Sequence, residues 1–427
     1  MVEHASRRAF LAGAAGVSLF CLSGCLTTTD EGYEVWSVDS GTNSIYIHEA
    51  HSEPNEETVE FDEVGSIDTG AENGTDPNTI TFSTEYEYAV VSCPGSGRTL
   101  VYRTEDSEQV ANLETGANTR FASFTPNDNA ILVDVAGESK IVRIDVDFEE
   151  EVFEVSDERS VDESVEGLGS GAGVPGFHTY TQDGRSVHTL GPRYRSGGVV
   201  IVDYAQLTVE TAFSSDVLPA TGDAVPHPTA EKMFLTAGSS SSTTNGSIGE
   251  YYVLDTDTNE LIDKGKTAGA DPKSVRLSPD GTELWILNSK TNDGVVVDAE
   301  TNEVIDKIGA VGPKESETAA KRDTRCNLRF SPDGQYAFVT LRGPAQRVEG
   351  QPVSSGVTPG IAVLDVTTRE LRHVVEPDPL GEYSDTETEA TRSSMEGKSL
   401  PDFRGLNVRP TDDFDGYSVP PYGNTTN

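Results

Sequence analysis

One repeated unit limits the folds open to this chain more than any other feature. Its clearest copy, residues 271–308, holds four short apolar stretches separated by turns, DPKSVRLSPDG, ELWIL, GVVVD and EVIDKI. The Ser-Pro-Asp-Gly turn at 278–281 favours a tight reversal, because proline presets φ and glycine takes positive φ without strain. The pattern returns at 327–365. Four short strands per unit, at a period of about 40 to 50 residues, predict a β-propeller.

The number of blades follows from the two ends of the chain. Weaker copies of the unit occupy residues 79–102, 121–144, 177–203 and 225–255. The first segment, 34–67, offers only three strands, and residues 402–410 match 271–279 almost position for position. A C-terminal strand that completes the N-terminal blade would close the ring and remove exposed edges. The alternative is that 402–410 is a coil tail.

The predicted fold is therefore all-β, a seven-bladed β-propeller with four-stranded antiparallel blades whose C-terminal strand closes the first blade. The unit DPKSVRLSPDGTELWILNSKTNDGVVVDAETNEVIDKI resembles those of the YVTN-type seven-bladed β-propeller family. The resemblance covers residues 33–410 and is strongest in the sixth and seventh blades. Blade three has Thr-Pro-Asn-Asp at 125–128 in place of Ser-Pro-Asp-Gly, and blade five has Thr-Ala-Glu-Lys at 229–232.

The N-terminus predicts export and lipidation. Arg7 and Arg8 precede an apolar stretch, 9–20, that is too short to span a bilayer and is typical of a signal peptide. The pair resembles a twin-arginine signal, and Leu-Ser-Gly-Cys at 22–25 resembles a lipobox that would lipidate Cys25. The alternative is an ordinary N-terminal membrane anchor. A twin-arginine route implies folding before export, so that a cofactor could be loaded inside the cell.

These signals divide the chain into a signal peptide (1–24), a flexible tether (25–32), the propeller (33–410) and a C-terminal tail (411–427). We expect an extracytoplasmic monomer held at the cell membrane by its lipid. The sequence identifies no cofactor.

The charge of the chain restricts its partners and its environment. With 72 acidic and 31 basic residues, the formal net charge is −41. Such self-repulsion is relieved in concentrated salt, which indicates a halophilic protein. Nucleic acid is excluded as an expected partner, because its binding requires a basic surface.

Basic residues nevertheless gather on the predicted innermost strands. Alignment places seven polar residues at one equivalent position: Thr81, Ser123, Thr179, His227, Arg276, Arg329 and Asn407. Neighbouring positions add Arg120, Lys273, Arg325 and Arg404. The basic members of both sets predict a site for a small anion or a protein partner at the channel mouth. The alternative is that they pair with acids or backbone carbonyls of the blades.

No catalytic or metal site is predicted. His178, His188 and His227 lack His-x-x-x-His or Glu-x-x-His spacing, and there is no Gly-x-Ser-x-Gly elbow or phosphate-binding loop. The sequence favours a membrane-tethered binding or interaction protein. The competing class is a propeller enzyme, either a lactonase-like hydrolase or a cofactor-dependent oxidoreductase, with its site in the channel.

Two further residue types carry expectations of modification. Asn73 and Asn245 begin Asn-x-Ser/Thr patterns and are candidate glycosylation sites. Cys93 and Cys326 are predicted to be two structural thiols, with a single disulfide bridge as the alternative.

Overall fold

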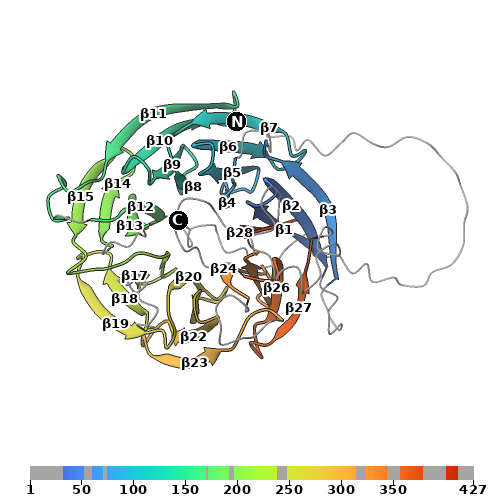
Figure 1. Ribbon diagram of the computed structural model, residues 1–427. Helices are drawn as coiled ribbons and strands as arrows, with labels where there is room; N and C mark the ends of the chain where they lie inside the picture. The colour runs from blue at the N-terminus through green and yellow to red at the C-terminus, as the bar shows by residue number, and fades with distance from the viewer. Residues whose placement is uncertain are drawn as a thin grey trace, which may run out of the picture.

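The fold is a seven-bladed β-propeller, as the sequence predicted. The computed structural model describes residues 32–51, 60–70, 75–169, 172–191, 197–237, 248–313, 323–343, 356–377 and 401–411. Their strands form seven four-stranded antiparallel sheets arranged round a central axis (Figure 1). No membrane-spanning helix is found in these ranges.

The first four blades follow one another round the ring. Blade one contains β28 (Phe403–Pro410), β1 (Gly32–Asp39), β2 (Ser44–His51) and β3 (Glu60–Asp68). Blade two contains β4 (Thr79–Phe82), β5 (Tyr88–Cys93), β6 (Arg98–Arg103) and β7 (Gln109–Glu114). Blade three contains β8 (Thr119–Phe124), β9 (Ala130–Val135), β10 (Lys140–Asp147) and β11 (Val152–Ser160). Blade four contains β12 (Val174–Tyr180), β13 (Arg185–Gly191), β14 (Val199–Asp203) and β15 (Thr208–Phe213).

The last three blades complete the circle. Blade five contains β16 (Ala224–Pro226), β17 (Lys232–Ala237), β18 (Glu250–Asp255) and β19 (Leu261–Lys266). Blade six contains β20 (Pro272–Leu277), β21 (Glu283–Asn288), β22 (Asp293–Asp298) and β23 (Val304–Ile308). Blade seven contains β24 (Arg325–Phe330), β25 (Tyr336–Leu341), β26 (Gly360–Asp365) and β27 (Leu371–Val375).

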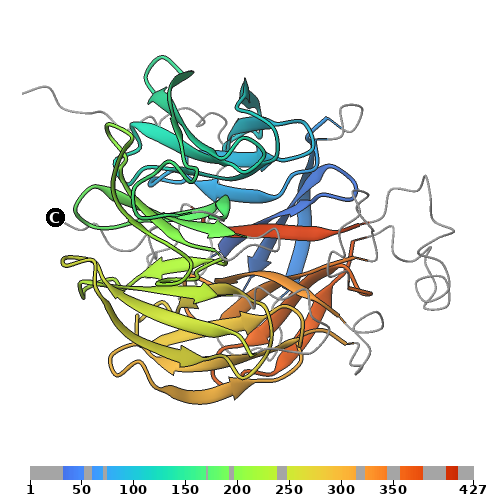
Figure 2. The same cartoon turned by 60° about the vertical axis from the view of Figure 1, so that its left-hand side comes forward.

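The two ends of the described chain meet in blade one, which confirms the predicted closure. β28 pairs antiparallel with β1, with Val35 opposite Val408 and Ser37 opposite Leu406. The red strand of β28 lies beside the blue strands of blade one in Figure 2. β28, which follows blade seven in the sequence, thus supplies the innermost strand of blade one and covers the edge of β1.

A common turn between the first and second strands of a blade explains the repeated sequence signature. In blade six the Ser278 hydroxyl donates to Asp280 (2.6 Å) and accepts from the amide of Glu283 (3.0 Å), while Gly281 has φ 72°. Blade three makes the same turn with Thr125, whose hydroxyl donates to Asn127 (2.9 Å). The divergent sequence therefore keeps a hydroxyl donor at the first turn position, which is the chemistry that such turns require.

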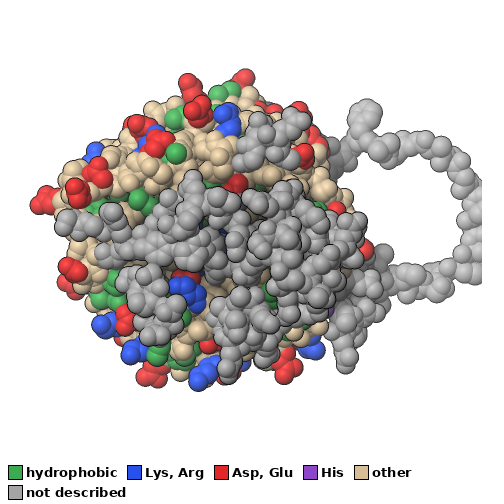
Figure 3. All heavy atoms as spheres, viewed as in Figure 1, with side chains coloured by type: hydrophobic (Ala, Val, Ile, Leu, Met, Phe, Trp, Pro, Cys, Tyr) green, Lys and Arg blue, Asp and Glu red, His purple; other side chains and the backbone are tan. Residues whose placement is uncertain are grey.

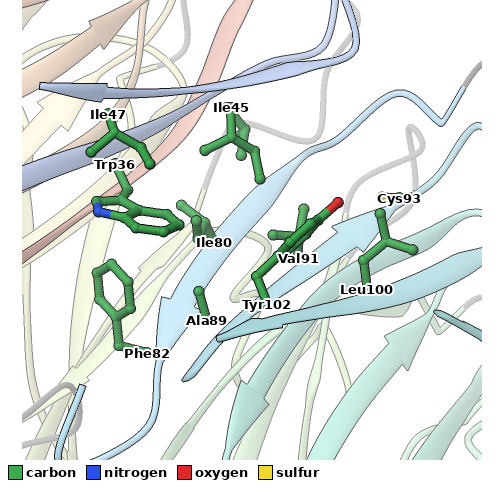
Figure 4. Packing of buried hydrophobic residues seen from close by; sticks show 11 residues of the cluster. Trp36, Ile45, Ile47, Ile80, Phe82, Ala89, Val91, Cys93, Leu100 and Tyr102 are labelled. Carbon is green, nitrogen blue, oxygen red and sulfur yellow. The ribbon is translucent and has the colours of Figure 1, made fainter. Parts of the chain in front are cut away.

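Apolar side chains fill the spaces between adjacent blades. Between blades one and two, Trp36 packs edge-on against Phe82 with ring centroids 5.7 Å apart (Figure 4). Ile45 and Ile47 from blade one and Val91 and Leu100 from blade two extend this layer. Burial of such side chains supplies roughly 25 cal/mol per Å² of apolar surface, so these layers are the main source of stability.

Candidate functional site

In six blades, the residues that the sequence alignment placed at one position of the innermost strand do lie at equivalent positions. Its residues pair with the second strand at matching points of the register: Thr81 with Val90, Ser123 with Leu132, Thr179 with Val187, Arg276 with Trp285, Arg329 with Phe338 and Asn407 with Trp36. In blade five, Val225 occupies this position, because it pairs with Phe234.

His227 is placed differently from the alignment made on sequence. It lies just beyond the three-residue strand β16, and its backbone amide bonds to the carbonyl of Lys232 as Ser278 bonds to Glu283 in blade six. Its Nδ1 accepts from the amides of Thr229 and Ala230 at 3.2 and 3.0 Å. His227 therefore occupies the turn position that Ser278 holds in blade six. The sequence alignment was wrong by two residues in this blade, where Pro226 and Pro228 flank the histidine.

Three of the predicted basic residues surround one carboxylate on the channel side. We call Asp223, Lys273, Arg276 and Arg329 the channel cluster. Arg276 Nη1 lies 3.1 Å from Asp223 Oδ2, and its guanidinium stands over the ring of Phe177 from blade four. Arg329 donates to Asn407 Oδ1 (3.2 Å) from the neighbouring blade. Burial raises the pKa of Asp223, and the charges of Arg276, Arg329 and Lys273 oppose this rise.

The channel cluster combines three cations with one anion, and Asp271 lies 3.8 Å from Lys273 Nζ, so the formal charge of these five groups is +1. Its members remain accessible, since the side chains of Lys273, Arg276 and Asp223 are 35%, 13% and 16% exposed. In Figure 3, acidic and basic side chains both stand round the periphery of this face, and one basic side chain is visible near its centre. The cluster is thus a positive site in a strongly negative molecule.

Arg404 belongs to a second group, at the junction of blades seven and one. We call Asp39, Arg342, Asp402 and Arg404 the closure cluster. Arg342 donates to both carboxylate oxygens of Asp402, from Nε at 2.5 Å and from Nη2 at 2.7 Å, and both side chains are almost wholly buried. Arg404 Nε lies 3.4 Å from the same carboxylate.

The closure cluster also joins the chain ends through hydrogen bonds. The amide of Asp402 donates to Asp39 Oδ1 at 2.7 Å, and the amide of Ser40 donates to the carbonyl of Asp402 at 3.1 Å. Burial raises the pKa of Asp39 to about 6. Arg404 therefore contributes to closure of the ring.

Arg325 and Arg120 complete the predicted set. Arg325 is 1% exposed and bonds to Asn292 Oδ1 (3.1 Å) and the carbonyl of Gly309 (3.3 Å), both in blade six. Burial lowers its pKa to about 9. It joins two blades and lies apart from the channel cluster. Arg120 is on β8, and its carbonyl accepts from Asn78 and Ser92 of blade two.

A buried polar network links blades three and four, and the sequence did not reveal it. The carboxylate of Asp134 bonds to two imidazoles, with Oδ2 3.0 Å from His178 Nδ1 and Oδ1 2.7 Å from His188 Nδ1. His178 Nε2 lies 2.7 Å from Ser123 Oγ, and His188 Nε2 lies 2.9 Å from Ser186 Oγ. We call these five residues, together with Tyr180, the His-Asp network.

The protonation of this network follows from its burial. Asp134, His178 and His188 are 0% exposed. Burial alone would raise the pKa of Asp134, but the two imidazoles hold it well below its ordinary range. Burial lowers the pKa of His178, against the opposing effect of Asp134. Asp134 is therefore an ionised carboxylate inside the protein.

Part of the network has the connectivity of a hydrolytic triad. Ser123, His178 and Asp134 form a Ser-His-Asp chain at hydrogen-bond distances. Ser123 is 0% exposed, however, so no substrate carbonyl can reach its hydroxyl. A second imidazole also shares the carboxylate. The geometry thus does not support nucleophilic catalysis by Ser123.

Several predicted sites cannot be placed. Arg7, Arg8, Cys25, Asn73 and Asn245 lie outside the described residues. Cys93 and Cys326 are both free, the first buried in the core and the second partly exposed, so the alternative of a disulfide bridge does not hold.

Comparison with known proteins supports the fold alone. No family model matches the sequence, and no curated protein matches it. Among solved structures, hydrazine synthase from Kuenenia stuttgartiensis is similar with a TM-score of 0.52 and 12% identity, over 73% of this chain and 83% of that one. A functionally unknown protein from Desulfotomaculum acetoxidans DSM 771 gives a TM-score of 0.54 and 13% identity, over 80% of this chain and 95% of that one.

Proposed function

We propose that this protein is a membrane-tethered, extracytoplasmic propeller that binds a small anionic ligand, of the carboxylate or phosphate class, in its central channel. The observation that carries the proposal is the channel cluster, in which Lys273, Arg276 and Arg329 gather round Asp223. Guanidinium groups recognise carboxylate and phosphate oxygens through charge-assisted hydrogen bonds. A rigid ring of blades holds them in place before the ligand arrives.

The charge of the whole molecule makes this site selective for compact anions. With a net charge of −41, the surface repels large acidic partners at low salt. A small anion that enters the channel meets a local excess of positive charge. In concentrated salt, screening over about 3 Å at 1 M leaves only such close contacts effective.

Calorimetric titration of the full chain with inorganic phosphate and with citrate tests the site. We expect Arg276→Gln combined with Arg329→Gln to weaken binding by at least about tenfold, which corresponds to roughly 1.4 kcal/mol. Asp223→Asn should strengthen binding, because the carboxylate competes with the ligand for the guanidinium groups. Lys264→Gln, on the exposed outer strand β19, is the matched control and should bind as the unaltered protein does.

The opposite results would reject the channel proposal. They are binding of neither anion by the unaltered protein, or equal binding by the double variant. An unchanged affinity in Asp223→Asn would reject competition between this carboxylate and the ligand.

The tether is proposed from Arg7, Arg8 and Cys25. In the native halophilic host that the composition favours, Cys25→Ser should move the protein from the membrane fraction to the medium. Replacement of both arginines by lysine should retain it inside the cell. Unchanged membrane association of the Cys25→Ser variant would reject the lipid anchor.

A further inference from the structure

The His-Asp network brings three metal-ligating side chains together in the interior. Asp134 comes from β9 in blade three, and His178 and His188 come from β12 and β13 in blade four. One ligand atom from each residue lies within 4.8 Å of the others. The two imidazole rings have centroids 4.8 Å apart and are tilted by 40°. Both Nδ1 atoms face the same carboxylate, one toward each oxygen, so their lone pairs converge on this group when they carry no proton.

From this convergence we propose that the His-Asp network is a structural site for one divalent transition metal ion of the zinc class. The ligands would be Nδ1 of His178, Nδ1 of His188 and the carboxylate of Asp134. Two imidazoles and a bidentate carboxylate supply four donor atoms of the kinds that Zn²⁺ accepts. The ion would take the place of the two N–H···O hydrogen bonds to Asp134.

The groups behind the histidines favour this exchange. A metal on Nδ1 requires the proton on Nε2, which must then donate to the neighbouring hydroxyl. Ser123 Oγ receives this proton at 2.7 Å and has Tyr180 OH, at 3.1 Å, as an acceptor for its own hydrogen. The Tyr180 hydroxyl in turn reaches the carbonyl of Ser123 at 3.2 Å.

The second histidine, His188, also has a serine hydroxyl that can accept its Nε2 proton. Ser186 Oγ lies 2.9 Å from His188 Nε2 and 3.4 Å from the carbonyl of Val202. Each imidazole can therefore move its one proton from Nδ1 to Nε2 without leaving a buried donor unsatisfied. No proton has to leave the site. Such outer hydrogen bonds are the usual means by which proteins orient metal-binding histidines.

The charge of the site also suits a cation. Among the described residues, Asp134 forms ion pairs only with these two histidines, which are charged only when protonated. Another buried carboxylate, Asp402, has Arg342 and Arg404 beside it. A divalent ion would stabilise Asp134 and would join blade three to blade four. Because all three ligands are 0% exposed, the metal must enter while the protein folds.

Metal analysis of the full chain tests this proposal. The protein is produced without a histidine tag in medium supplied with Zn²⁺, then dialysed against a chelator and against excess Mg²⁺ to clear the acidic surface. Elemental mass spectrometry should find close to one zinc ion per chain. Both His178→Asn and His188→Asn should lose it, because the amide of asparagine can still donate to Asp134 but does not ligate zinc.

Two further measurements separate this outcome from a folding defect. His373→Asn, which removes a histidine of blade seven that packs on Phe61, should retain the zinc. Growth with Co²⁺ should give the visible absorption of a four-coordinate site in the unaltered protein, and a histidine variant of unchanged circular dichroism should lack it. Folded, unaltered protein without stoichiometric zinc would overturn the proposal. Zinc content in the two network variants equal to that of the unaltered protein would also overturn it.

Discussion

At two of the blade junctions that the structure describes, basic side chains bind a buried carboxylate, and they do so in different ways. Between blades seven and one, Asp402 accepts two hydrogen bonds from Arg342. Between blades three and four, Asp134 accepts from His178 and His188. Elsewhere, apolar side chains such as Trp36 and Phe82 join neighbouring blades. An arginine is always charged, whereas an imidazole need not be.

The difference reflects what each junction has to do. The first must select one strand, β28, from the far end of the chain, and a buried ion pair is satisfied only in the correct register. The second joins blades that are adjacent in sequence and needs no such selection. Its imidazoles can accept either a proton or a metal ion. The arginines at the junction that closes the ring therefore keep their charge. We call the junction of blades three and four the adaptable junction, because its imidazoles can take up either a proton or a metal ion.

Removal of the Asp402 charge should have the largest effect. Asp402→Asn leaves the buried Arg342 without its counter-ion, so we expect a loss of about 3–5 kcal/mol in the free energy of unfolding. Denaturant titration at fixed salt measures it. The matched control is Asp145→Asn, which breaks the exposed pair with Arg143 and should cost less than about 1 kcal/mol. Equal effects of the two substitutions would show that the closure ion pair contributes nothing specific.

The pKa of Asp39 predicts that the closure cluster contributes to the pH dependence of stability. Burial raises this pKa from 3.8 to about 6, so the folded protein binds a proton that the unfolded chain has released. The contribution of Asp39 to the free energy of unfolding is therefore greatest below about pH 4. It falls by about 3 kcal/mol as the pH rises through about 6. Asp39→Asn should abolish that part of the slope. Parallel pH profiles of unfolding free energy for the variant and the unaltered protein would contradict the assignment.

The same change at the adaptable junction should cost less. In metal-free protein, Asp134→Asn removes one acceptor from the two histidines, but each imidazole can move its proton to Nε2 and donate to a serine. We expect a loss of about 1–2 kcal/mol, smaller than at Asp402. The measurement is the same denaturant titration. A larger loss for Asp134→Asn than for Asp402→Asn would reverse the proposed contrast.

The sequence predicted the fold well because its signals are local. The Ser-Pro-Asp-Gly turns at 278–281 and 331–334 and the match between 402–410 and 271–279 were enough for seven closed blades. The outer strands β7, β11 and β15 were not assigned, because many of their side chains face solvent and show no apolar pattern. In blade five the sequence misplaced His227, since β16 spans only three residues.

The candidate sites were harder to predict because they depend on contacts between blades. His178 and His188 were considered as metal ligands, but Asp134 was not, because it lies near the end of the apolar strand Ala130–Val135. An acid inside an otherwise buried strand is the signal that could have found it. Asp223 was missed for a related reason. It precedes β16, and only the folded ring brings Arg276 and Arg329 to it.

Hydrogen exchange of the full chain, followed by mass spectrometry, tests ring closure most directly. If β28 is the innermost strand of blade one, the amides of residues 403–409 should exchange as slowly as those of β1, residues 32–39. The amides of the exposed outer strand β19 should exchange faster than both. Exchange of 403–409 at the rate of an unstructured peptide, with 32–39 still protected, would contradict closure of the ring by the C-terminal strand.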